Sequence, residues 1–207
     1  MSNFHEKGNE IIQDLLSIAK DKLDWIQIAE KEEVIVYQKY YPSSNISVVK
    51  GEGIVNSPLQ NIKQLLCNIE NNKKWDPLFE SGNTIMDLEH EKLSLVSYKT
   101  KSKLTVWPRE FFVLRSANTF SDGTFVTAGK SIEDYNYFKP DQRCVLGNLI
   151  ISGFLLTPID DFTTHVCYIL HVDPCGWIPS GIVNDNIKLQ PLGIIGIRKE
   201  LTGKSHS

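Results

Sequence analysis

The densest group of chemically versatile side chains lies in the segment THVCYILHVDPC, residues 164–175. Histidine, cysteine and aspartate are common ligands of transition metals. In an extended strand, however, six residues separate His165 from His171, and the resulting distance of about 20 Å is too long for one shared ion. Only His165 and Cys167 could chelate together, and two ligands do not make a structural zinc site. We therefore expect no metal and no other cofactor.

The alternation of side chains along a strand gives this segment a second interpretation. Its odd-numbered residues form the less apolar face. The even-numbered residues form an apolar face, which we assign to the side of an internal cavity: Val166, Tyr168, Leu170 and Val172.

The sequence contains none of the motifs of common catalytic sites. Ser152-Gly153 and Ser180-Gly181 lack the glycine two positions before the serine that a nucleophile elbow requires. Neither a phosphate-binding glycine loop nor an H-E-x-x-H zinc motif occurs. We therefore expect no enzyme and assign no catalytic residue. An enzyme acting on a small hydrophobic substrate is the alternative, and its loose acid–base candidates are His165, His171 and Tyr98.

Arg115 is a charged residue in the middle of an apolar strand. In the segment EFFVLRSA it shares one face with Phe111 and Val113. A charge in apolar surroundings is costly unless it is paired or solvated. Two interpretations follow: Arg115 points outward from an edge strand, or it is buried and holds a polar head group, best a phosphate or carboxylate.

The segment KTKSKLTVWP, residues 99–108, alternates three lysines with Leu104, Val106 and Trp107. As a loop between strands it would expose apolar residues beside basic ones, which is typical of membrane docking. Alternatively, the apolar residues are tucked inward and the lysines form a solvated edge.

Composition places the chain among ordinary soluble proteins. The 207 residues, 41% hydrophobic and 23% charged, fit one domain with a sizeable core. A net charge of −3 gives no sign of nucleic-acid binding. The absence of a signal-peptide pattern and of a membrane-spanning stretch, together with four cysteines typical of free thiols, predicts a cytoplasmic protein. We also expect a monomer.

The hydrophobic spacing predicts an α+β fold. Helical periodicity occurs in residues 8–20, from Ser57-Pro58 to Leu66, and after Pro179. Nine strand-like runs lie between these segments: 25–29, 34–40, 46–55, 83–88, 93–100, 110–120, 124–132, 145–156 and 163–172. We expect one curved antiparallel sheet covered by a long C-terminal helix, which Pro191, Gly193 and Gly196 interrupt.

A space between such a sheet and its helix suits an apolar ligand. Burying each CH₂ contributes about 0.8 kcal/mol, so one sixteen-carbon chain is worth roughly 12 kcal/mol before entropic costs. Binding a lipid therefore requires a cavity of sufficient size and no catalytic residues. The residues expected to contact it are Tyr98, Phe111, Val113, Arg115, Val166, Tyr168, Leu170, Ile182, Val183 and Ile187.

Three segments, in order, resemble the START lipid-transfer domain family, in its phosphatidylcholine-transfer-protein-like form. They are KKWDP with Trp75 and Asp76, WPREFFVLR at residues 107–115, and HVDPCGWIPSGIVN at residues 171–184. The order of elements matches from about residue 8 to residue 203 of a single domain covering 1–207. The resemblance implies a helix-grip fold, a tunnel for one lipid, and a lid formed by the C-terminal helix and the loop Lys101 to Pro108.

By motif, Arg115 matches the arginine that this family often points into its tunnel. In sterol and phospholipid carriers of the family an acid on the preceding strand or nearby commonly accompanies it, and no acid lies between Lys92 and Pro108. This favours a ligand with its own negative charge. We expect a carrier of one lipid, preferably a phospholipid, that contacts membranes transiently. The alternatives are a helix-grip enzyme and a ligand-gated lipid sensor.

Overall fold

The computed structural model describes residues 2–41, 44–90, 92–101, 107–134 and 136–203. One mixed sheet of ten strands dominates it, in the order β1-β2-β3-β10-β9-β7-β6-β5-β4, and β8 pairs with β6 beside this path. The strands are β1 Ile26–Lys31, β2 Val34–Lys39, β3 Val48–Val55, β4 Phe79–Glu89, β5 Leu93–Thr100, β6 Arg109–Thr119, β7 Phe125–Ser131, β8 Val145–Leu146, β9 Asn148–Asp160 and β10 Thr163–Asp173. The predicted curved antiparallel architecture is confirmed, and β1 and β4 are its two free edges.

The tenth strand arises because one predicted strand, 145–156, is divided at Gly147. Val145 pairs with Arg109 in the sheet's one parallel ladder among the described residues, whereas β9 runs antiparallel to β7 and β10. A Cβ on Gly147 would lie 2.4 Å from the ring of Phe111. A side chain at the position where the chain changes partners would therefore clash with that ring, so a glycine is needed there.

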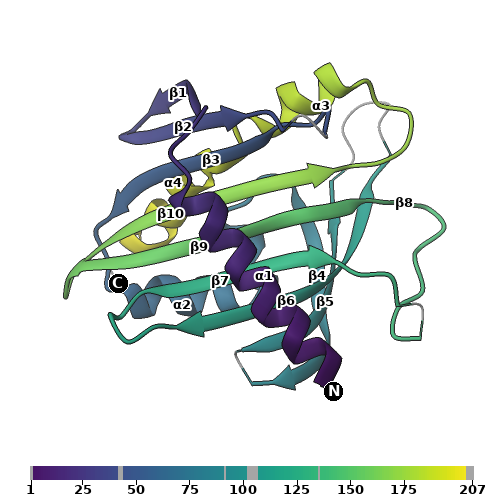
Figure 1. The fold of residues 1–207 in the computed structure, drawn as a ribbon, viewed down its shortest axis with the longest axis horizontal. Helices are drawn as coiled ribbons and strands as arrows, with labels where there is room; N and C mark the ends of the chain where they lie inside the picture. Colours follow the sequence, from purple (N-terminus) through teal and green to yellow (C-terminus); the bar gives the residue numbers. More distant parts are fainter. Residues whose placement is uncertain (1, 42–43, 91, 102–106, 135, 204–207) are drawn as a thin grey trace.

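Helix α1, Ser2–Lys20, covers one face of the sheet and crosses it diagonally in Figure 1. Its apolar stripe, with Ile11, Ile12 and Leu15 all buried, packs against β5, β6, β7, β9 and β10. Because this face is covered as well, the odd-numbered side of β10, with Cys167 and Ile169, is buried under α1. Among the described residues, no helix is long and apolar enough to cross a membrane.

The opposite, inner face of the sheet is covered by short helices. These are α2 Leu59–Cys67, the 3₁₀ helix η1 Ile69–Lys74, α3 Ser180–Ile187, the 3₁₀ helix η2 Gln190–Leu192 and α4 Gly193–Thr202. The C-terminal segment that was expected to form one long helix is therefore divided into α3, η2 and α4. Pro191, which has no N–H to donate, lies in the first turn of η2 and ends the preceding helix.

The last piece, α4, packs directly on Trp75. A Cβ on Gly196 would lie 2.6 Å from the carbonyl oxygen of Trp75, and one on Gly193 would lie 3.2 Å from its ring. The break before α4 lets this helix reach Trp75, and the glycines make the close approach possible.

Gly196→Ala should therefore destabilise the fold by about 1–3 kcal/mol, because backbone atoms of Trp75 must move. The midpoint of guanidinium unfolding measures this. Gly181→Ala is the matched control, since nothing lies within 4 Å of its added Cβ. It should be neutral or stabilising by up to about 1 kcal/mol. Equal effects of the two variants would contradict the packing described for α4.

Candidate functional site: a cavity under the short helices

A cavity of about 270 Å³ lies between the inner face of the sheet and the helices that cover it. This is near the lower end of the volumes of small-molecule sites. Strands β5, β6, β9 and β10 provide one wall, and residues of η1, α3 and the β10–α3 connection provide the other. Most of the wall is apolar, including Leu66, Val96, Leu149, Phe154 and Ile178.

Nearly all of the predicted contact residues lie around this cavity. The residues that line it are Tyr98, Phe111, Val113, Arg115, Tyr168, Leu170, Ile182, Val183 and Ile187. Val166 is fully buried in the same core but does not line the cavity. Trp107 lines the cavity and is 61% exposed, which places it at the mouth. Leu104 and Val106 lie outside the described residues.

Arg115 points inward, as the second interpretation of its strand proposed. It lies between Ser94 of β5 and Gly129 of β7 in the sheet and lines the cavity. Burial lowers the pKa of its guanidinium, and the nearby Cys67 and Asp87 act in the opposite direction. Within the described residues no hydrogen bond or ion pair to Arg115 is formed. The side chain is thus a desolvated cation facing an apolar space.

Arg109 also lines the cavity, but its guanidinium is occupied. Nε donates to the carbonyl of Pro174 and Nη2 to that of Cys175, each at 3.1 Å. Cys175 and Gly176 have positive φ values of 54° and 75°. Arg109 therefore fastens the strained connection between β10 and α3 to the start of β6. Sequence reasoning missed this role, because the two ends of the contact are more than sixty residues apart.

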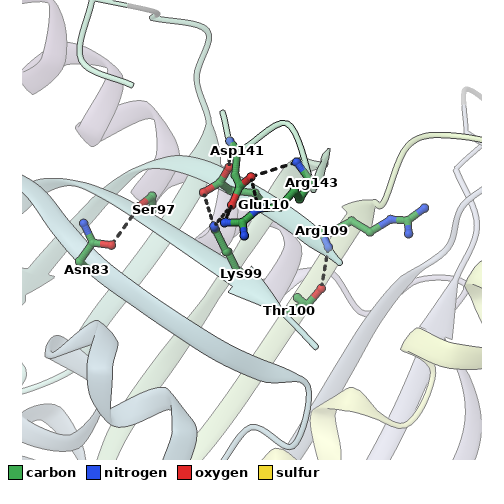
Figure 2. A network of polar contacts seen from close by, with 8 residues as sticks. All are labelled: Asn83, Ser97, Lys99, Thr100, Arg109, Glu110, Asp141 and Arg143. Carbon is green, nitrogen blue, oxygen red and sulfur yellow. Dashed lines mark hydrogen bonds and ion pairs between the residues drawn. The ribbon is translucent and has the colours of Figure 1, made fainter. Parts of the chain in front are cut away.

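A polar network fixes the ends of β5 and β6 from outside (Figure 2). Lys99 Nζ lies 2.7 Å from Asp141 and 3.7 Å from Glu110, and the backbone N–H of Asp141 donates to Glu110 at 2.7 Å. Hydrogen bonds from Arg143 and Lys99 hold the pKa of Asp141 well below its usual range. Figure 2 shows the Arg109 side chain directed away from this cluster while its backbone N–H meets Thr100.

Asp76 supplies an acid to the cavity wall that the sequence search did not find. That search covered Lys92 to Pro108, whereas Asp76 lies between η1 and β4. Its Oδ1 accepts the backbone N–H of Leu78 at 2.8 Å, and burial raises its pKa. Tyr98 and Tyr168 lie close enough that the Asp76 charge contributes to raising the pKa of both phenols, after burial as the main cause. The only sequence signal was the Trp-Asp pair of KKWDP.

Besides Trp107, five aromatic rings of the described residues line the same cavity. Tyr98 stacks on Phe111 with ring centroids 4.8 Å apart, and Phe154 stacks on Tyr168 at 4.3 Å. Trp75 meets Phe154 and Tyr168 edge to face, and its Nε1 is buried with no hydrogen-bond partner in the described part of the chain.

The acid–base candidates of the enzyme alternative are not brought together. His171 lies on the α1 side of β10, where it bonds the carbonyl of Ile46 at 3.2 Å, and burial lowers its pKa. His165 does not line the cavity, whereas Tyr98 does. Among the described residues, no group of three or more His, Cys, Asp or Glu side chains could hold a metal ion.

Asp76→Asn should stabilise the protein at neutral pH by on the order of 1 kcal/mol, because it removes a buried carboxylate and keeps an acceptor for Leu78. Since folding raises this pKa, folded wild type binds more protons than the unfolded chain between the two pKa values. Its stability therefore falls as pH rises through the folded pKa.

Thermal unfolding of both proteins from pH 3 to pH 8 measures this difference. The gain in Tm should be full at neutral pH and vanish toward about pH 3, near the pKa of an unperturbed aspartate. A constant difference at every pH would show that the carboxylate charge of Asp76 is not the cause.

Sequence comparison shows which known proteins this chain resembles. The START domain family model matches residues 6–192. The chain is 24% identical over 192 residues to the steroidogenic acute regulatory protein of Xenopus laevis, covering 88% of this chain and 65% of that protein. It is also 24% identical over 152 residues to an ENHANCED DISEASE RESISTANCE 2-like protein of Arabidopsis thaliana, covering 70% of this chain and 21% of that one. The chain thus spans less than two thirds of either relative.

Solved structures share the fold at low sequence identity. Human StAR-related lipid transfer protein 5 superposes with a TM-score of 0.87 at 19% identity, covering 98% of both chains. Human STARD10 gives 0.83 at 19% identity, over 93% of this chain and 79% of that one. The Zhui aromatase/cyclase of Streptomyces superposes with a TM-score of 0.55 at 11% identity, covering 77% of this chain and 96% of that one. Because the START domain model matches most of the chain, the chain belongs to the START domain family.

Proposed function

We propose that this chain is a lipid carrier that holds one amphipathic lipid in the cavity and exchanges it at membranes without catalysing a reaction. The observation that carries the proposal is the cavity itself: an apolar space with the unpaired cation Arg115 in its wall. Apolar walls favour an acyl chain or ring system in proportion to the area removed from water. Residues 8–203 act as one domain in this proposal, and the chain works as a monomer in the cytoplasm.

The head group should carry a negative charge. A guanidinium in a low-dielectric site is stabilised by a phosphate or carboxylate, which it can bind through two parallel hydrogen bonds. A phospholipid brings such a phosphate and is the ligand class we favour. The volume of about 270 Å³ suits one chain better than two, so single-chain phosphates and carboxylates belong to the same proposal.

Membrane contact is proposed at the mouth of the cavity. Trp107 is 61% exposed, Trp177 in the β10–α3 connection is fully exposed, and Ile182 of α3 lines the cavity while being 52% exposed. Tryptophan is favoured at membrane interfaces, where its ring is partly apolar and its N–H stays hydrated. Exchange then requires α3 to move on a microsecond-to-second scale against the contacts that Arg109 makes.

Arg115→Met should lower the affinity for a phospholipid or lysophospholipid by about tenfold or more, because it removes the charge and keeps the apolar stem. Equilibrium binding of a fluorescent lysophospholipid measures this. Arg143→Met is the control, since Arg143 bonds Asp141 outside the cavity and its loss should leave binding unchanged. Unchanged binding in Arg115→Met would refute the head-group role.

Trp107→Ala and Trp177→Ala should each slow lipid transfer between vesicles several-fold and leave binding of a monomeric lipid nearly unchanged. Each removes a large apolar group from the proposed membrane contact. Phe162→Ala, at an exposed phenylalanine of the β9–β10 turn that does not line the cavity, is the control and should not affect transfer. Equal slowing by all three variants would contradict a docking surface at the mouth.

A further inference from the structure

The cavity wall near Arg115 contains a hydroxyl group that the carrier proposal does not use. Thr127 of β7 is only 6% exposed and lines the cavity. Its side chain makes no hydrogen bond within the described part of the chain. Among the described residues, the fully buried polar side-chain atoms without a partner are Trp75 Nε1 and Arg198 Nη2, and Thr127 Oγ1 is not one of them. The hydroxyl therefore has accessible surface, and this surface opens into the cavity.

The pairing of β6 with β7 places Thr127 diagonally across from Arg115. Gly129 is the register partner of Arg115, and Ala117 is the register partner of Thr127. Directly opposed residues share a face, so all four lie on the inner face of the sheet. Arg115 and Thr127 occupy one diagonal of this group, at a distance of about 7–8 Å between Cα atoms. The other diagonal has only a methyl group and a hydrogen atom, and it is bordered by Val113, whose Cγ1 lies 2.7 Å from a Cβ added to Gly129.

A second aliphatic hydroxyl in this part of the wall already uses its proton. Ser152 of β9 is the register partner of Gly129 on the side away from β6, and it also lines the cavity. Its Oγ donates to the carbonyl of Ile169 at 3.0 Å. A hydroxyl has one proton to donate, so Ser152 can only accept from a ligand. Of these two hydroxyls, Thr127 is therefore the one that can donate to an anion held by Arg115.

We propose that Arg115 and Thr127 together bind a phosphate monoester at the charged end of the lipid, and that Thr127 selects this phosphate over a carboxylate. This inference rests on the proposed function and names its head group. A guanidinium binds two oxygens of an anion through parallel hydrogen bonds, which uses both oxygens of a carboxylate. A phosphate monoester has a third oxygen, to which Thr127 donates. A phosphate with a hydrogen bond of about 2.8 Å on each side is similar in width to the space between the two residues.

Three amphiphiles of one chain length test this selection. Myristic acid has a carboxylate, tetradecyl phosphate has a phosphate monoester, and the phosphate of tetradecylphosphocholine is a diester with one free oxygen fewer. Displacement of a fluorescent lysophospholipid, at concentrations below micelle formation, measures the affinity for each. The wild type should bind tetradecyl phosphate about tenfold or more tightly than myristic acid, because one hydrogen bond to a charged group is added. Tetradecylphosphocholine should bind more weakly than tetradecyl phosphate.

Variants of Thr127 assign the preference to its hydroxyl. Thr127→Val replaces the hydroxyl by a methyl group, so it should weaken binding of tetradecyl phosphate about tenfold and change binding of myristic acid less than about twofold. Thr127→Ser keeps the hydroxyl and should retain the preference. Thr157→Val, the same substitution at an exposed position of β9 outside the cavity, is the control and should leave every affinity unchanged. Thr127→Ala takes the place of the valine variant if thermal unfolding shows that the latter does not fold.

The outcomes separate this inference from the carrier proposal. Unchanged binding of tetradecyl phosphate by Thr127→Val, or equal weakening of the phosphate and the carboxylate, would overturn the role of Thr127 and leave the carrier intact. Tighter binding of tetradecylphosphocholine than of tetradecyl phosphate by the wild type would overturn the monoester. Binding of none of the three amphiphiles, or full binding of all three by Arg115→Met, would contradict the anionic ligand at Arg115, and the inference with it.

Discussion

The packing of Trp75 between the sheet and helix α4 is the contact on which the cavity depends. On one side the indole meets Phe154 and Tyr168 edge to face, at 5.4 and 5.9 Å between ring centroids. On the other side the indole lies against Gly193, and the backbone of Trp75 lies against Gly196. Because the glycines have no Cβ, α4 packs closely on Trp75, while Arg198 of α4 also donates to the carbonyl of Ile54 in β3. The Trp75 side chain holds one end of the covering helices away from the sheet, and this leaves room for a ligand beside it.

Three of the charged residues that line this cavity, Asp76, Arg109 and Arg115, have different surroundings. The guanidinium of Arg109 donates hydrogen bonds to the backbone carbonyls of Pro174 and Cys175, so its role is structural. Arg115 has no hydrogen bond or ion pair in the described part of the chain, whereas the Asp76 carboxylate accepts the backbone N–H groups of Leu78 and Phe79. Burying an uncompensated charge opposes folding. Arg115 is therefore the charged group that we assign to the ligand.

The strands were predictable from the sequence, because alternation along a strand fixes which side chains share a face. The same rule placed Arg115, Tyr168 and Leu170 together around the cavity. The covering helices were less predictable: hydrophobic spacing after Pro179 indicates a helix but does not show where it breaks to meet Trp75. Asp76 was missed because it comes from a turn, where no periodicity assigns a direction to the side chain.

The central claim is that the cavity holds one lipid with an anionic group. Native mass spectrometry of the purified chain, followed by extraction and identification of what it carries, tests this most directly. The account predicts one lipid per chain with a phosphate or carboxylate, and loss of that lipid in Arg115→Met. A chain that is empty after purification and takes up no lipid from mixed vesicles would contradict the account.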